Sequence, residues 1–134
     1  MNIARPVRII ATIAALVAVA FGMGTYTHAD FTSIHILFGL IVALALLILA
    51  VLAVFTSGSG RLGAIGIVYA LIMPIFGVTQ QTILVGDLHW LVETAHLAVG
   101  FGAVALIGTI SARLVLLRQT ARNVSGQQQP QPVR

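Results

Sequence analysis

The chain has 134 residues, of which 59% are hydrophobic and 7% are charged, and its formal net charge is +4. A soluble domain carries about 25% charged residues, so this composition excludes a water-exposed surface over most of the chain. The arginines lie at the ends of apolar runs and not on one basic face, which argues against a nucleic-acid partner, and the absence of cysteine excludes disulfides and thiolate metal sites.

Four apolar runs are each long enough to cross a bilayer as a helix, which takes about 20 residues. In chain order, we predict spans at about residues 7–26, 33–55, 62–84 and 88–117. The connectors between these runs are short, so consecutive helices must be antiparallel. The sequence therefore predicts an all-α integral membrane protein whose main partner is the lipid bilayer. Its fold is an up-down-up-down four-helix transmembrane bundle over residues 1–124.

The first apolar run has two interpretations. Arg5 and Arg8 precede it and Thr27, His28 and Ala29 follow it, an order that resembles a cleavable signal peptide. The apolar stretch is longer than the usual core of a signal peptide. We therefore expect it to remain in the protein as the first span.

Charged residues predict the direction of the spans. The arginines all fall on one side of the predicted bundle, at positions 5, 8, 61, 113, 118, 122 and 134, whereas Asp30 and Asp87 fall in the loops of the other side. Because positive loops stay in the cytoplasm, we predict a multi-pass protein of the inner (cytoplasmic) membrane with both termini cytoplasmic. The polar, proline-containing residues 125–134 are then expected to form a disordered cytoplasmic tail.

An internal repeat relates the two halves of the chain with an offset of 61 residues. The matching positions are His28 with His89, His35 with His96, and Gly39 with Gly100. Both matching segments enter the membrane from the outer side, so a two-fold pseudo-repeat about the membrane normal is predicted.

The repeat predicts a cofactor site. His35 and His96 belong to the second and fourth spans, which are diagonal partners in an up-down bundle, and two neutral imidazoles on opposite helices can ligate haem iron from both faces. Gly39 and Gly100 lie one turn deeper on the same faces, where a missing side chain leaves room for a flat macrocycle. We therefore predict a haem b site in which His35 and His96 are the metal ligands.

Three further polar residues belong to the predicted cofactor site. Glu93 shares a helix face with both histidines of the fourth span, and we expect it to accept a hydrogen bond from an imidazole and fix its tautomer. His28 and His89 are expected to form an outer polar cluster that holds haem propionates, a quinone head group or a metal ion. The alternative is that these histidines bind loop carbonyls or water and that the glycines only allow close helix packing.

This pattern resembles small b-type haem membrane proteins, including cytochrome b561-like four-helix bundles and one half of a haem A synthase. In the latter family each four-helix half carries one histidine on its second helix and one on its fourth, and His35 and His96 occupy the matching places. That family also has a glutamate three residues before the second-helix histidine, where this chain has Thr32. The resemblance implies haem binding, and we do not extend it to the synthase reaction.

Three functions follow from these features. The first is a haem b-binding membrane protein that acts in electron transfer or haem handling near the outer membrane face, with a quinone as a candidate partner. The second is a cofactor-free accessory subunit of a larger membrane complex. The third is a proton-coupled transporter module, which is disfavoured because no polar stripe crosses the inner half of the predicted bundle.

Overall fold

The computed structural model describes residues 3–25 and 30–127. These residues form helices and no strand, in the order α1 (Ala4–Thr25), α2 (Thr32–Val54), α3 (Gly60–Thr79), a short 3-10 helix η1 (Gln80–Thr82) and α4 (His89–Gln127). Each of the four α-helices is long and apolar enough to cross a membrane. The prediction of an all-helical protein with four apolar spans is therefore confirmed.

Two helix ends differ from the sequence prediction by more than three residues. The third helix ends at Thr79 and not at residue 84; it is followed by η1 and then by a turn in which Leu84 and Gly86 have φ angles of 48° and 111°. The fourth helix continues to Gln127, into the segment expected to be a disordered tail. Residues 128–134 of that tail lie outside the described part of the chain.

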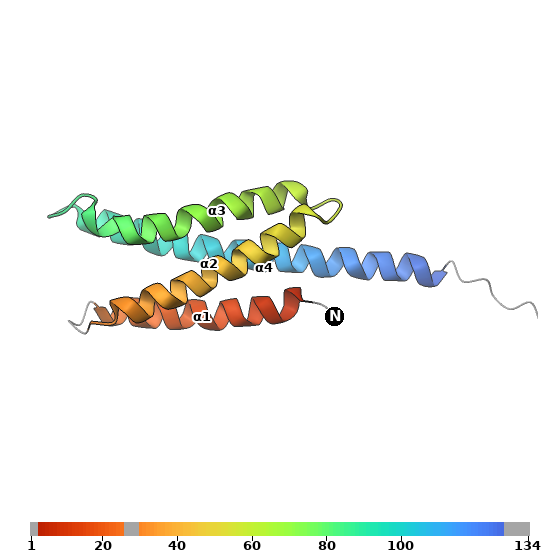
Figure 1. Ribbon diagram of the computed structural model, residues 1–134, viewed down its shortest axis with the longest axis horizontal. Helices are drawn as coiled ribbons and strands as arrows, with labels where there is room; N and C mark the ends of the chain where they lie inside the picture. The colour runs from red at the N-terminus through yellow and green to blue at the C-terminus, as the bar shows by residue number, and fades with distance from the viewer. Residues whose placement is uncertain (1–2, 26–29, 128–134) are drawn as a thin grey trace, which may run out of the picture.

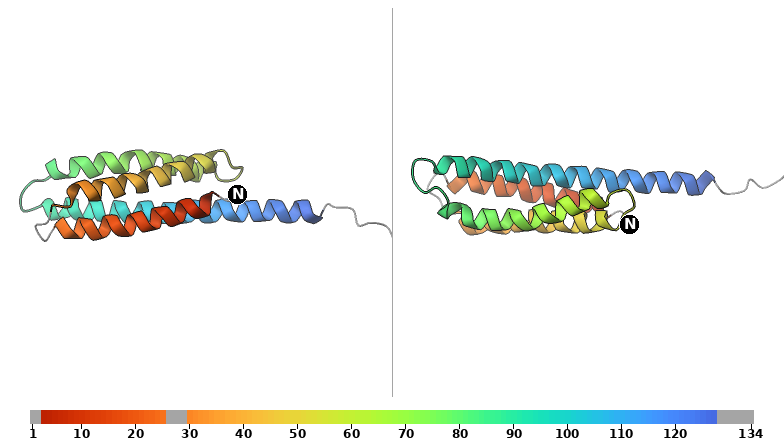
Figure 2. Two further views of the ribbon diagram at one scale, coloured as in Figure 1. Left: turned by 60° about the horizontal axis from the view of Figure 1, so that its bottom comes forward. Right: turned by 90° about the horizontal axis from the view of Figure 1, so that it is seen from above.

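Consecutive α-helices run in opposite directions along the long axis of the molecule (Figure 1). α2 contacts all three other helices, including α4 across the bundle, whereas α1 and α3 make no contact within the described residues. The two helices that carry the histidines of interest therefore meet in the middle of the bundle. The last part of α4 extends beyond the start of α1 (Figures 1 and 2).

The two ends of the bundle are packed differently. We call the end with the first residues of α1 and α3 the arginine end, because Arg5, Arg8 and Arg61 lie there, and the opposite end the histidine end. The buried core lies toward the arginine end, where Leu46 and Leu49 of α2 share a cluster with the buried face of α4 formed by Ala103, Ile107, Ile110 and Leu114. Small residues bring the helices close in this half.

Most large apolar side chains of this protein are exposed, and α3 alone exposes Ile65, Val68, Leu71, Ile72, Ile75 and Val78. A soluble protein rarely exposes an apolar surface of this extent. A helix that faces hydrocarbon requires it, because lipid replaces water as the solvent of these side chains. The distribution of exposed residues thus agrees with the apolar character of the four helices.

Candidate functional site

His35 of α2 and His96 of α4 lie beside each other at the histidine end of the bundle. The centroids of their imidazole rings are 5.7 Å apart and the ring planes are inclined by 56°. Two imidazoles that bind one metal ion from opposite sides, with bonds of about 2 Å, have centroids on the order of 6 Å apart. The observed separation is therefore close to that of an axial ligand pair.

The helix register explains how these rings meet. His35 is the fourth residue of α2 and His96 is the eighth residue of α4. At 1.5 Å per residue, the difference of four residues corresponds to roughly 6 Å along the helix axes. Since the rings are neighbours, α4 must begin about one turn farther out than α2.

His35 is held by α1. Its Nδ1 atom lies 2.8 Å from the backbone carbonyl oxygen of Ala18. A carbonyl only accepts hydrogen bonds, so Nδ1–H is the donor and, in the neutral ring, Nε2 keeps its lone pair. Gly22 lies against the same ring, because a Cβ atom added there would be 3.0 Å from both Cε1 and Nδ1 of His35.

His96 has a different environment. Its Nδ1 atom is buried and has no hydrogen-bond partner within residues 3–25 and 30–127. The ring of Phe76 on α3 lies 6.1 Å away, centroid to centroid, with an interplanar angle of 37°. A Cβ atom added to Gly77 would be 3.5 Å from Cε1 of His96, which is an ordinary van der Waals contact. Packing, and not a hydrogen bond to Nδ1, therefore positions this ring.

The bundle is open around the two histidines. No residue of α2 before Val42 is buried, and none of α4 is buried between Val92 and Ala103. Cβ atoms added to Gly39 and Gly100, one turn deeper than the histidines, would meet nothing within 4 Å. Gly39 is half-buried and Gly100 is exposed, so the open space at Gly100 extends to the bundle surface.

The other predicted site residues are arranged less closely. The Nδ1 atom of His89, the first residue of α4, is 3.2 Å from the carbonyl oxygen of Ile83, a contact of the kind expected for an interfacial histidine. Glu93 is half-buried on α4, and it does not bond to Nδ1 of His96, which has no partner among the described residues. His28 lies outside the described residues.

The described residues bring two histidine side chains together at this place. In residues 3–25 and 30–127, no three histidine, cysteine, aspartate or glutamate side chains come together in a way that could hold a metal ion. A bis-histidine haem needs only two protein ligands. The pair of His35 and His96 meets this number.

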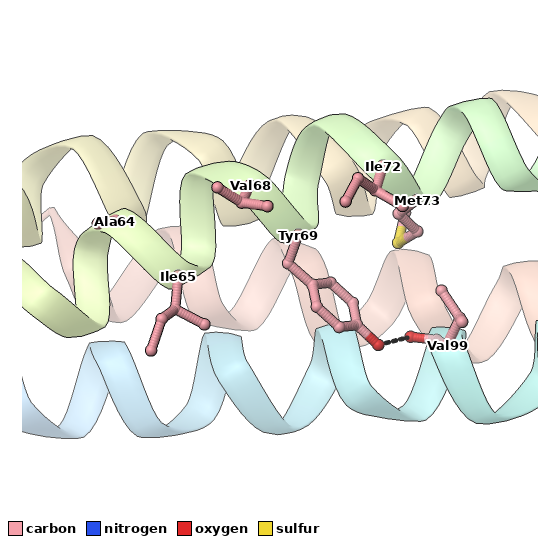
Figure 3. Close-up of a pocket in the computed structure, with 7 residues that line it drawn as sticks. All are labelled: Ala64, Ile65, Val68, Tyr69, Ile72, Met73 and Val99. Carbon is pink, nitrogen blue, oxygen red and sulfur yellow. Dashed lines mark hydrogen bonds between the residues drawn. The ribbon is translucent and has the colours of Figure 1, made fainter.

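An open apolar pocket of about 480 Å³ lies between α3 and α4, deeper in the bundle than the histidine pair. Its lining residues are Ala64, Ile65, Val68, Tyr69, Ile72, Met73 and Val99 (Figure 3). The hydroxyl of Tyr69 crosses to α4 and donates a hydrogen bond to the carbonyl oxygen of Val99, 2.8 Å away. Neither His35 nor His96 lines this pocket, so it is separate from the candidate site.

Sequence reasoning missed the contribution of the odd-numbered helices. Ala18 and Gly22 of α1 contact His35, while Phe76 and Gly77 of α3 contact His96. The signal in the sequence for these contacts is the presence of glycine within an apolar span, which allows a neighbouring side chain to approach the helix backbone. The sequence alone does not say which ring each glycine faces, because that depends on the rotation of one helix against another.

Comparison with known proteins adds no relative: no protein-family model, no curated protein and no solved structure matches this chain.

Proposed function

We propose that this protein is a membrane-embedded haem b-binding protein in which His35 and His96 are the axial ligands. The observation that carries the proposal is the approach of these two rings, 5.7 Å apart, from helices that cross the middle of the bundle. In a soluble protein a pair of neighbouring histidines is commonplace. Inside an apolar span each polar ring is costly, so two rings that converge there indicate a function.

The environment of the rings supports metal ligation. The hydrogen bond to Ala18 leaves Nε2 of the neutral His35 ring available as a ligand, an arrangement that proteins use to orient histidines bound to metals. The ring of His96 packs against Phe76 of α3, and its Nδ1 atom has no hydrogen-bond partner among the described residues. The open space beside Gly39 and Gly100 supplies room next to both helices.

The haem would supply one-electron chemistry, and this chain would supply its binding, orientation and apolar surroundings. His89, at the outer start of α4, is suited to hold a propionate, and we assign His28 the same role from its place in the repeat. Glu93 is half-buried on the same helix and would set the polarity of the site mouth. We propose electron transfer or haem handling as the role, with a quinone as the candidate redox partner.

The membrane arrangement is part of the proposal. Positive residues mark the cytoplasmic side of inner-membrane proteins, and the arginine end carries Arg5, Arg8 and Arg61. The bundle would therefore run up-down-up-down with both termini in the cytoplasm. The repeat of 61 residues would place its two histidine-bearing helices side by side with the haem near the outer face.

An absorption spectrum tests the haem proposal. Protein purified after expression with ample haem is expected to show a Soret band, and His35→Ala or His96→Ala is expected to remove it when no other ligand is added. Thr94→Ala is the matched control, because Thr94 is exposed on α4 near His96 and its hydroxyl bonds to Trp90 of its own helix. A colourless wild-type protein would refute haem binding.

The second candidate is a cofactor-free accessory subunit of a larger membrane complex. The open apolar pocket between α3 and α4 favours it, because a neighbouring helix could cover that surface. A colourless preparation that copurifies with a larger membrane complex, and stays bound to it after His35→Ala, would support this function.

A further inference from the structure

The hydrogen bond between His35 and Ala18 depends on a glycine one turn along α1. Helical side chains lean toward the N-terminus, so a side chain at position 22 would cover the carbonyl group of Ala18. Gly22 has no side chain, and the His35 ring occupies the space that one would need. Gly22 therefore leaves this carbonyl accessible to a donor from a neighbouring helix.

His96 also lies beside a glycine of a neighbouring helix but does not make a corresponding hydrogen bond through Nδ1 within the described residues. Gly77 of α3 also faces the ring of its neighbouring histidine, but at an ordinary contact distance. Nδ1 of His96 has no partner in the part of the chain that the structure describes. A hydrogen bond to the second nitrogen fixes the tautomer of a ligating imidazole and increases its basicity. Each histidine ring thus lies beside a glycine of a neighbouring helix. Of the two Nδ1 atoms, only that of His35 makes a hydrogen bond within the described residues.

From this asymmetry we infer that His35 is the fixed ligand of the site and His96 the exchangeable one, with Ala18 and Gly22 as positioning residues for His35. This inference rests on the proposed haem binding. It assigns ligand exchange to the α4 side, where an external nitrogen ligand can take the place of His96.

Restoration of haem binding by free imidazole tests the inference in the two histidine variants. Haem is expected to return to His96→Ala when imidazole is added, with a wild-type-like Soret band, because His35 still anchors the iron. His35→Ala is expected to stay colourless under the same conditions. Rescue of both variants to the same extent, or of His35→Ala alone, would overturn the assignment.

A measurement without haem tests the positioning residues separately. In protein labelled at histidine and held in detergent micelles, NMR is expected to show the Nδ1–H tautomer for His35, assigned as the signal missing from His35→Ala. Gly22→Ala should change that signal, because the new methyl group forces the ring away from the Ala18 carbonyl, whereas Gly108→Ala should leave it unchanged. An Nε2–H tautomer in the wild-type protein would contradict the role of Ala18.

The same pair of variants connects the two measurements. Loss of a hydrogen bond to a metal-ligating histidine lowers metal affinity about 10–100-fold, so Gly22→Ala is expected to weaken haem binding by that amount. Gly108→Ala, which adds a methyl group to open space away from the site, is expected to change it little. Equal effects of the two variants would contradict the inference. If the wild-type protein binds no haem, the proposed function fails, and the NMR signal still decides whether α1 holds His35.

Discussion

The hydroxyl of Tyr69 on α3 donates a hydrogen bond to the carbonyl of Val99 on α4, with an oxygen–oxygen distance of 2.8 Å. The hydrogen bond from His35 of α2 to the carbonyl of Ala18 on α1 is of the same kind. In both, a side chain donates to a backbone carbonyl of a neighbouring helix, and a glycine lies beside the donor. Beside Tyr69 that glycine is Gly102, three residues after Val99. Glycine thus allows polar contacts between these apolar helices.

Removing the hydroxyl of Tyr69 should destabilise the bundle slightly. Interhelical hydrogen bonds in membranes contribute about 0.6 kcal/mol on average and up to about 1.7 kcal/mol, so Tyr69→Phe is expected to lower the free energy of unfolding by an amount in this range. Unfolding of the purified protein in detergent measures the change. An unchanged stability would mean that the Val99 carbonyl gains nothing from this bond.

Adding a methyl group at Gly102 should have a larger effect. The new Cβ atom would collide with the hydroxyl of Tyr69, and overpacking of this kind costs about 1–3 kcal/mol. Gly108→Ala is the matched control, because a Cβ atom at Gly108 of the same helix meets nothing within 4 Å. Equal unfolding midpoints for the two variants would contradict the packing of Tyr69 against α4.

The contact between α2 and α3 depends on Gly63. A Cβ atom added there would lie 2.6 Å from the carbonyl oxygen of Ala50 and from the amide nitrogen of Val54. Backbone atoms do not rotate away, so Gly63→Ala is expected to separate the helices and cost about 1–3 kcal/mol. Gly60→Ala serves as the control because its Cβ atom would be 3.7 Å from Val54. Thermal unfolding in detergent compares the two.

The open space beside the histidines should be sensitive to bulk if it holds a macrocycle. Gly39→Leu and Gly100→Leu fill positions where an added Cβ atom meets nothing, so the fold is expected to persist while haem content falls. Gly108→Leu adds the same side chain to open space far from the site. Haem-to-protein ratios measure the effect, and full occupancy in all three variants would exclude these glycines from the site.

Thiol labelling tests the direction of the bundle. The chain has no cysteine, so Ser57→Cys and Val85→Cys, at exposed positions of opposite ends, each introduce a single thiol. In intact cells, an impermeant maleimide is expected to label position 85 and not position 57, because the arginine end would face the cytoplasm. The reverse pattern would invert the proposed topology.

Composition and hydropathy determined the number and approximate position of the helices. An apolar stretch of bilayer length must satisfy its own backbone hydrogen bonds, so it forms a helix whatever its neighbours are. Hydropathy locates the helix ends less accurately. It places apolar Leu84 in the third helix, although the backbone has already turned there. Polar residues up to Gln127 extend α4, because each residue added to a helix gains a hydrogen bond.

The sequence also singled out His35 and His96 by their repeat, but it gave no reason for their rings to be at the same depth. Only the tertiary structure decided that, since it sets where α4 begins relative to α2. It also decided that Ala18 and Gly22 hold the ring of His35, while Nδ1 of His96 has no partner in the described part of the chain. Such contacts depend on the rotation and offset of packed helices, and hydropathy contains no information about either.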